Sequence, residues 1–100
     1  MRSRVVITGL GGICGLGTDV PAIWQAMREG RSAIGEITTV PLHELKVRIG
    51  AEVKELPDHG IERRRLVTMD RFSLLAVIAA GEAIRQSVLD LSRANEKRVG

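Results

Sequence analysis

The stretch from Met69 to Leu91, MDRFSLLAVIAAGEAIRQSVLDL, decides the fold of this chain. Residues 74–80 are apolar without interruption, so on a helix they cover the whole circumference and need burial on every side. Polar and apolar residues then follow in an amphipathic pattern, and Asp70 is a suitable N-cap. The stretch therefore predicts a helix over residues 70–91. Its apolar run is far shorter than the ~20 residues that cross a bilayer, so we expect no stable membrane insertion.

This helix is too large for the chain that carries it. At 1.5 Å per residue it would be about 33 Å long, whereas a compact chain of this size has a radius of gyration of only about 13 Å. We therefore expect residues 74–80 to be one piece of a larger core, completed by further sequence or by a partner.

Composition limits the classes of protein that remain. The 100 residues allow one domain at most, and 44% hydrophobic with 27% charged residues indicates a globular protein. Aromatic side chains are restricted to Trp24 and Phe72, which weighs against nucleic-acid binding by base stacking. The net charge of +3 suits an acidic partner. Cys14 is the single cysteine, which excludes an internal disulfide and favours a reducing, cytoplasmic setting.

The other patterns predict an α/β layered architecture. β-branched residues at 4–8 indicate a buried parallel strand, and residues 46–54 alternate as a half-solvated strand does. The remaining predicted elements are a helix from Thr18 or Asp19 to about Glu29, ended by Gly30, a short strand at 34–40, and the start of a strand at 97–100. The order is β-α-β-β-α with an unfinished final strand.

The glycine-rich turn at residues 9–17 has the position of a phosphate-binding loop but not its spacing. In a G-x-G-x-x-G fingerprint that starts at Gly9, the third glycine would be residue 14, which is a cysteine. A Walker loop would need a lysine after Gly17, where Thr18 stands. We interpret these glycines as permitting close packing of strand and helix; a degenerate dinucleotide-binding unit is the weaker alternative.

No catalytic or metal site is predicted from the residues themselves. Cys14 lies near a helix N-terminus but has no histidine near it in sequence, so a small buried hydrophobe is the expected role. His43 and His59 lack metal-ligand spacing and companion cysteines. The run Arg63-Arg64-Arg65 is either a solvated face or a docking patch for an acidic or phosphorylated partner.

Several stretches resemble, in order along the whole chain, the N-terminal segment of a β-ketoacyl-acyl carrier protein synthase, type II. The matching pieces are Val5-Val6-Ile7-Thr8-Gly9-Leu10-Gly11, Leu16-Gly17, Trp24, Gly30-Arg31-Ser32-Ala33-Ile34, Glu52-Val53-Lys54 and Met69-Asp70-Arg71-Phe72-Ser73. The variants at 12–17 and 66–70 bring the chain nearest to the rhizobial nodulation protein E branch; Gly15 stands where the family more often has proline.

The resemblance implies that residues 1–100 are an incomplete N-terminal segment of a thiolase-like fold. It implies decarboxylative Claisen condensation with malonyl-carrier protein in fatty acid or Nod-factor acyl-chain biosynthesis. It further implies a homodimer for the full-length enzyme and no metal or organic cofactor. Its catalytic cysteine and two histidines lie beyond residue 100, so Cys14, His43 and His59 do not take those roles and the chain alone should be inactive.

The resemblance also assigns a partner. Basic residues just before the Met-Asp signature face the acidic acyl carrier protein in this family, so Arg64, flanked by Arg63 and Arg65, is the expected docking site. Val67 and Thr68 replace residues that are often basic, which displaces or weakens the patch. The alternative is a small basic α/β interaction module that binds an acidic partner through the same three arginines.

Overall fold

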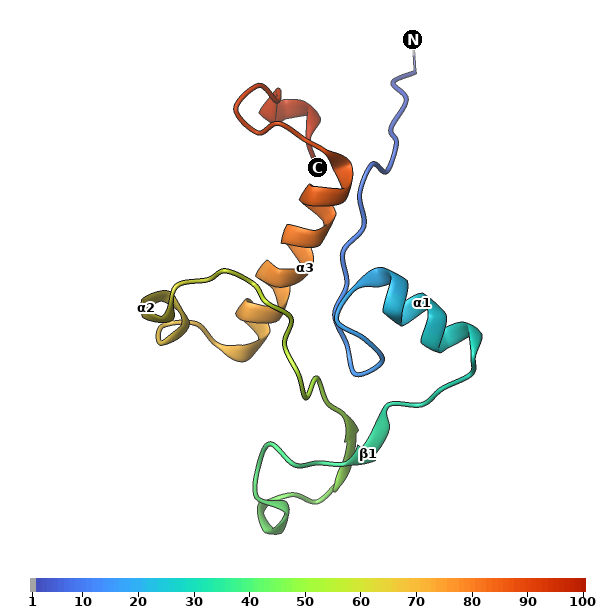
Figure 1. The fold of residues 1–100 in the computed structure, drawn as a ribbon, viewed down its shortest axis with the longest axis vertical. Helices are drawn as coiled ribbons and strands as arrows, with labels where there is room; N and C mark the ends of the chain where they lie inside the picture. Colours follow the sequence, from blue (N-terminus) through green and yellow to red (C-terminus); the bar gives the residue numbers. More distant parts are fainter. Residues whose placement is uncertain (1) are drawn as a thin grey trace.

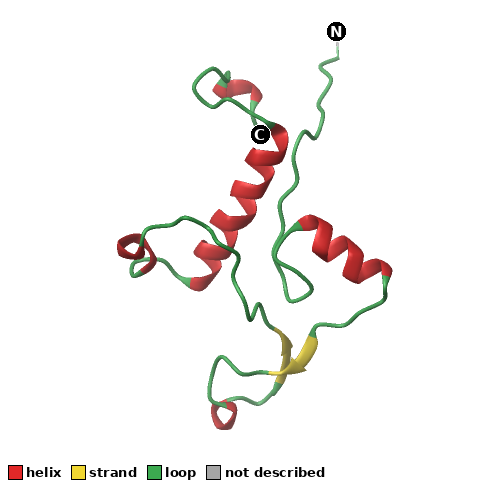
Figure 2. Ribbon diagram, viewed as in Figure 1, coloured by secondary structure: helices red, strands yellow, loops and turns green. Residues whose placement is uncertain are grey.

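The computed structural model describes residues 2–100. Its elements, with η for a 3-10 helix, are α1 (Val20–Arg28), β1 (Ile34–Glu36), η1 (Leu42–Glu44), β2 (Ile49–Ala51), α2 (Arg63–Leu66), α3 (Arg71–Ser87) and η2 (Glu96–Arg98). α3 lies between α2 on one side and the N-terminal stretch with α1 on the other (Figure 1). The two short strands lie together at the opposite end of the molecule from the N-terminus (Figure 2).

The predicted long helix is present as α3, but it is shorter than predicted. It begins after Asp70, which has extended backbone angles, and ends at Ser87 because Val88 adopts a left-handed conformation with φ of 54°. Leu74 and Ile78, one turn apart, are buried, whereas Val77 is 49% exposed. The helix therefore has one buried stripe in this chain, which agrees with the expectation that residues 74–80 are one piece of a larger core that these 100 residues do not complete.

α1 agrees with its predicted bounds because both of its ends are set locally. The Asp19 carboxylate accepts a hydrogen bond from the Ala22 N–H at 2.8 Å, which caps the N-terminus. At the other end Gly30 has φ of 68°, and the following Arg31 N–H donates to the Ala26 carbonyl at 3.0 Å. This is the glycine-dependent helix stop that the sequence predicts.

β1 and β2 form a two-stranded antiparallel sheet in which Gly35 lies opposite Gly50. The strands are shorter than predicted, three residues each. The Glu52 carboxylate holds the segment that connects the two strands. It accepts hydrogen bonds from the N–H and hydroxyl groups of Thr38 and Thr39 at 2.8–3.1 Å. We call this arrangement the Glu52 clasp.

Two predicted strands are not formed. Residues 4–8 have no regular secondary structure and pair with no strand, and residues 96–98 form η2 in place of the start of a strand at 97–100. The predicted β-α-β-β-α order is thus corrected to an order that begins with α1. The physical reason is that a strand needs a neighbour to pair with, whereas the capped helices are specified by nearby sequence.

The glycines that precede α1 pack against α3. A Cβ on Gly9 would collide with the Ala83 carbonyl, and a Cβ on Gly11 with that of Ala79. Side chains of α3 hold the same stretch: the Leu10 N–H donates to the Gln86 amide oxygen, and the Gly12 N–H donates to the Glu82 carboxylate at 3.0 Å. The expectation that these glycines serve close packing is confirmed, with the partner being α3.

The molecule is less compact than a globular chain of 100 residues. Its radius of gyration is 17.1 Å and its axes measure 57 × 38 × 25 Å. The buried hydrophobic side chains among the described residues are Ala26, Leu74 and Ile78.

Candidate functional site

The three arginines expected to dock a carrier protein form nearly all of α2. The short helix is held at its start by the Glu62 carbonyl, which accepts hydrogen bonds from the N–H groups of Arg65 at 2.9 Å and Leu66 at 3.2 Å. Leu66 is half-buried, while Arg63, Arg64 and Arg65 are exposed. The sequence places the apolar residue inward and the cations outward.

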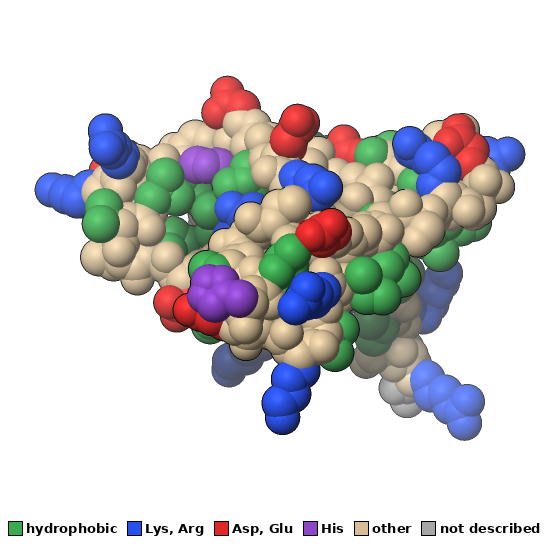
Figure 3. Space-filling model, turned by 90° about the horizontal axis from the view of Figure 1, so that it is seen from below, with side chains coloured by type: hydrophobic (Ala, Val, Ile, Leu, Met, Phe, Trp, Pro, Cys, Tyr) green, Lys and Arg blue, Asp and Glu red, His purple; other side chains and the backbone are tan. Residues whose placement is uncertain are grey.

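The guanidinium groups of α2 remain available to a partner. Among residues 2–100, Arg31 forms an ion pair with Glu29 at 3.0 Å and the His43 imidazole lies 3.8 Å from the Glu44 carboxylate, so no described carboxylate neutralises α2. Three consecutive helical residues point about 100° apart, so they cannot all face one surface. Figure 3 shows Lys and Arg side chains projecting at the edge where α2 lies, beside exposed hydrophobic side chains.

The residues after α2 change the character of this surface. Val67 is 80% exposed, and the Thr68 hydroxyl donates to the Arg65 carbonyl at 2.9 Å, so it is turned back onto the helix end. Arg71 is also exposed, but its guanidinium donates to the Val53 carbonyl at 2.6 Å and ties the start of α3 to the segment after β2. Arg63, Arg64 and Arg65 thus make no described ion pair, and their role in docking stays a prediction.

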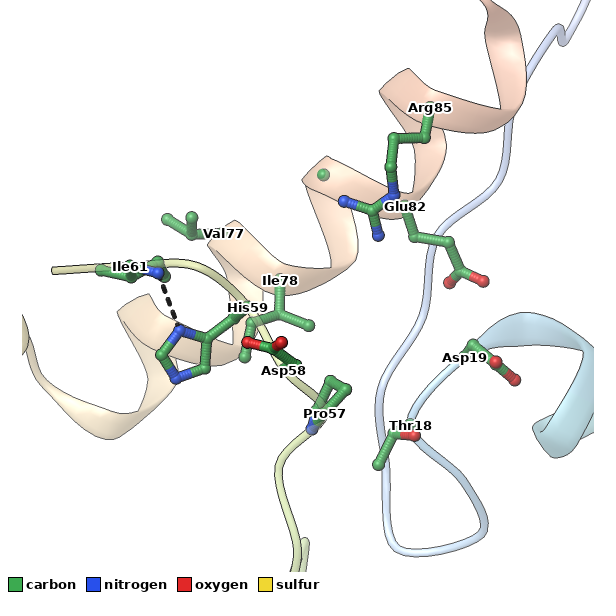
Figure 4. Close-up of a pocket in the computed structure, with 11 residues that line it drawn as sticks. Thr18, Asp19, Pro57, Asp58, His59, Ile61, Val77, Ile78, Glu82 and Arg85 are labelled. Carbon is green, nitrogen blue, oxygen red and sulfur yellow. Dashed lines mark hydrogen bonds between the residues drawn. The ribbon is translucent and has the colours of Figure 1, made fainter.

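A cavity of about 300 Å³ lies between α3, the turn before α1 and the loop before α2. Figure 4 shows Asp58, His59, Glu82 and Arg85 among the residues that line it. Two of these side chains hold the fold: the His59 Nδ1 accepts a hydrogen bond from the Ile61 N–H at 3.0 Å, and Glu82 accepts from the backbone of Gly12 and of Val20 at the start of α1. These two side chains therefore fix the loops around the cavity.

The residues weighed for catalysis or metal binding lie in separate parts of the fold. Cys14 is half-buried in the glycine-rich turn, where its backbone exchanges two hydrogen bonds with Gly17 at 2.9 and 3.2 Å. His43 is in η1, and His59 is in the loop before α2. Within residues 2–100, no three His, Cys, Asp or Glu side chains are grouped so that they could hold a metal ion.

Two carboxylates were not singled out from the sequence. The hydroxyl and N–H groups of Thr39, together with those of Thr38, lower the pKa of Glu52 from 4.5 to about 2 and outweigh the opposing effect of desolvation. Glu82 joins the glycine-rich stretch and the N-terminus of α1 to α3. A signal existed for each: the adjacent pair Thr38-Thr39, and a lone acid directly after an apolar helical run.

Neither α3 nor any other described helix combines the length and the apolar character that a membrane span requires.

Comparison with known proteins identifies the family. Residues 2–100 match the family model described as "Beta-ketoacyl synthase, N-terminal domain". The chain belongs to this family. Nodulation protein E of Rhizobium sp. (strain N33) is 64% identical over 100 residues, and Nodulation protein E of Rhizobium meliloti (strain 1021) is 61% identical over the same length.

Relatives named for the condensing activity are more distant. The 3-oxoacyl-[acyl-carrier-protein] synthase 2 of Synechocystis sp. is 36% identical over 100 residues, covering 99% of this chain. The chain spans about a quarter of the length of these curated relatives, 25% for the nodulation proteins and 24% for the Synechocystis synthase. The resemblance expected from the motifs is confirmed, both for the synthase family and for its nodulation protein E branch.

Proposed function

We propose that this chain is the N-terminal part of a 3-oxoacyl-[acyl-carrier-protein] synthase. The observation that carries the proposal is the family match over residues 2–100, together with identity to nodulation protein E and synthase 2 relatives along the whole chain. The enzyme would extend acyl chains for fatty acid or Nod-factor synthesis.

The reaction proposed is a decarboxylative Claisen condensation. Malonyl-carrier protein loses carbon dioxide, and the resulting carbanion attacks the carbonyl of an acyl chain held as a cysteine thioester. A carbon–carbon bond forms, the cysteine thiolate leaves, and the 3-oxoacyl chain remains on the carrier. Two histidines would stabilise the enolate oxygen that develops at decarboxylation. We place these groups in sequence beyond residue 100, so the chain alone is expected to be inactive.

The described residues would supply scaffold and part of the carrier interface. We infer a thiolase-like layering in which α3 is a core helix, and a homodimer in the reducing cytoplasm, without metal or organic cofactor. The exposed, unneutralised arginines of α2 support docking of an acidic carrier. Such charges mainly raise the association rate and are screened by salt.

The test uses a joined enzyme: residues 1–100 of this chain followed by the sequence that comes after the matched quarter in Nodulation protein E of Rhizobium sp. (strain N33). Arg64→Glu reverses one charge on α2. Because an exposed ion pair contributes about 0.2–1 kcal/mol, we expect kcat/KM for carrier-bound substrates to fall severalfold at low salt and to recover at high salt. Acyl groups on small thiols should be used as before.

Arg93→Glu is the matched control, since it makes the same charge change at an exposed arginine outside α2. It should leave kcat/KM for carrier-bound substrates within twofold of the unaltered enzyme, about the limit set by an exposed charge with no partner. Equal losses on carrier-bound and small-thiol substrates, or a defect insensitive to salt, would show that α2 is only a solvated face. Absence of condensation by the unaltered joined enzyme would contradict the proposed reaction itself.

A further inference from the structure

Val67 is an apolar side chain on a charged surface. It is 80% exposed, whereas Leu66 before it and Met69 after it are half-buried. Its backbone continues the helical turn of α2: φ is −63° and ψ is −26°, and its N–H donates to the Arg63 carbonyl at 3.3 Å. The direction of this side chain is therefore set by the helix and not by an irregular loop.

Val67 shares one face of α2 with two of the three arginines. Residues three and four positions apart are neighbours on a helix, so Val67 lies beside Arg64 and Arg63. Arg65, two positions away, points to nearly the opposite side of the helix. Figure 3 shows hydrophobic side chains beside the Lys and Arg side chains at the edge where α2 lies. One face of α2 thus presents two guanidinium groups with an apolar side chain next to them.

An apolar core cannot cover this face. It would bury Arg63 and Arg64, which meet no carboxylate among residues 2–100. An unpaired charge is strongly destabilising when it is buried. Val67 does not serve the helix either, because β-branched residues have low helix propensity. A segment that covers Val67 must therefore carry acidic groups beside an apolar side chain.

We propose that Val67 is a specificity-determining contact with the carrier protein, and that it packs against an aliphatic side chain lying between acidic residues on a carrier helix. The inference rests on the proposed function and deepens it, since it names the chemistry that the carrier presents to α2. Charge complementarity selects this occupant, because the two free guanidinium groups suit carboxylates on either side of the aliphatic residue. The χ1 angle of valine is already restricted, so its side chain loses little entropy when it is covered.

The apolar contact provides a discrimination that charge alone lacks. Attraction by Arg63 and Arg64 acts on any acidic protein, and salt screens it. Burial of an aliphatic side chain against Val67 is a short-range gain that is not an ion pair and is not screened in this way. A carboxylate in the same place would lose water without gaining a partner. The charged and apolar contributions can therefore be separated by their response to salt.

The test measures binding of a carrier protein to the joined enzyme, without any need for catalysis. The probe is the acyl carrier protein of Rhizobium sp. (strain N33) that binds the unaltered joined enzyme most tightly. Its Kd is measured by fluorescence anisotropy of the labelled carrier at low and at high sodium chloride. Val67→Ala removes two methyl groups and should weaken binding by about 3- to 10-fold at both salt concentrations. The defect of Arg64→Glu should instead diminish at high salt.

Val67→Lys distinguishes an apolar partner from an acidic one. It adds a positive charge opposite an acidic carrier, so attraction between charges alone predicts tighter binding at low salt. An aliphatic partner predicts binding weaker by about threefold or more, because the ammonium group would lose water at the contact. Val67→Ile keeps a branched aliphatic side chain and should bind within about twofold of the unaltered enzyme.

Val47→Ala is the matched control, because Val47 is 64% exposed and lies outside α2. It should leave the Kd of the carrier unchanged. Circular dichroism of each variant shows whether it is folded, and normal binding by Val67→Ile separates loss of the contact from loss of the helix. Unchanged binding by a folded Val67→Ala would overturn the proposal and make Val67 a solvent-exposed side chain only. Tighter binding by Val67→Lys would also overturn it, since an acid would then lie opposite this position.

The outcomes separate this inference from the proposed function. Condensing activity together with unchanged carrier binding by Val67→Ala would uphold the function and contradict the contact. Binding that Val67→Ala weakens, in a joined enzyme that does not condense, would uphold the contact and contradict the proposed reaction alone. If neither the joined enzyme nor its two pieces expressed together bind any of these carriers, both the contact and docking through α2 are wrong.

Discussion

At the scale of single residues, Glu52 holds the segment between β1 and β2. Its two oxygens accept five hydrogen bonds from Thr38 and Thr39, and these hold the pKa of the carboxyl at about 2. A carboxyl whose pKa is lower in the folded chain stabilises the fold at pH values above its unfolded pKa. The clasp is therefore complete above pH 4.5, weakens as the pH falls, and is lost near pH 2.

Thr39→Val removes the hydroxyl that lowers this pKa most. We expect the midpoint of the Glu52 carboxyl titration, followed by carbon-13 NMR, to rise from about 2 toward 4.5, because fewer donors then favour the charged form. Thr68→Val is the matched control: its hydroxyl donates to the Arg65 carbonyl, away from the clasp. The assignment of the clasp is wrong if both variants titrate alike.

Prediction from sequence succeeds for residues whose role follows from the residue type at a single position. The glycines at residues 9–17 lack the spacing of a phosphate-binding loop, so the sequence predicts that they serve close packing. Gly9 and Gly11 do lie against a helix backbone. The sequence does not tell which helix they meet, because that contact joins residues about seventy positions apart. The anchoring role of Glu82 is hidden for the same reason: an acid in a helix gives no sign of which distant N–H groups it accepts.

At the scale of elements, α1 and α3 differ in how they stop. α1 ends on Gly30, which adopts its positive φ without steric cost, whereas the left-handed position after α3 is occupied by Val88. Left-handed backbone costs a residue with a Cβ about 1–2 kcal/mol. Helix propensity and the apolar pattern extend to Leu91 and do not reveal the left-handed conformation of Val88. They therefore overestimate the length of α3.

Val88→Gly should raise the free energy of unfolding of the joined enzyme by about 1 kcal/mol, since glycine accepts the left-handed conformation that ends α3. Urea unfolding measures the change. Val99→Gly is the control, because Val99 has a negative φ of −106° and gains nothing from glycine. A lower midpoint for Val88→Gly than for the unaltered enzyme would mean that the end of α3 is different in the complete fold.

The strands show the opposite limit of reasoning from sequence. The alternation over 46–54 correctly indicates extended chain, and β2 forms where β1 offers a neighbour. Residues 4–8 have a stronger strand composition, yet they remain unpaired because no described residue lies beside them to exchange hydrogen bonds. Strand propensity is a property of one segment, whereas a strand forms only when a second segment pairs with the first.

At the scale of the whole molecule, the large radius of gyration and the many exposed apolar side chains both indicate an incomplete core. The radius of gyration of 17.1 Å exceeds the about 13 Å of a compact chain of 100 residues. Exposed large apolar side chains are spread over the N-terminal stretch, α1, the strands and α3; they include Ile7, Trp24, Ile49 and Phe72. The sequence predicted this deficit from α3 alone, since a helix apolar on all sides requires more cover than the chain contains.

The last prediction concerns the isolated chain. Burying one large apolar side chain contributes about 1.5–3 kcal/mol, and too few are buried here to offset about 1–2 kcal/mol of backbone entropy for every ordered residue. We therefore expect the 100-residue chain to associate, or to unfold over a broad temperature range without a sharp transition. In the joined enzyme α3 and residues 4–8 should gain cover, and melting should become cooperative. Circular dichroism and sedimentation measure both; a sharp melt from a monodisperse monomer of the isolated chain would mean that its small core is sufficient.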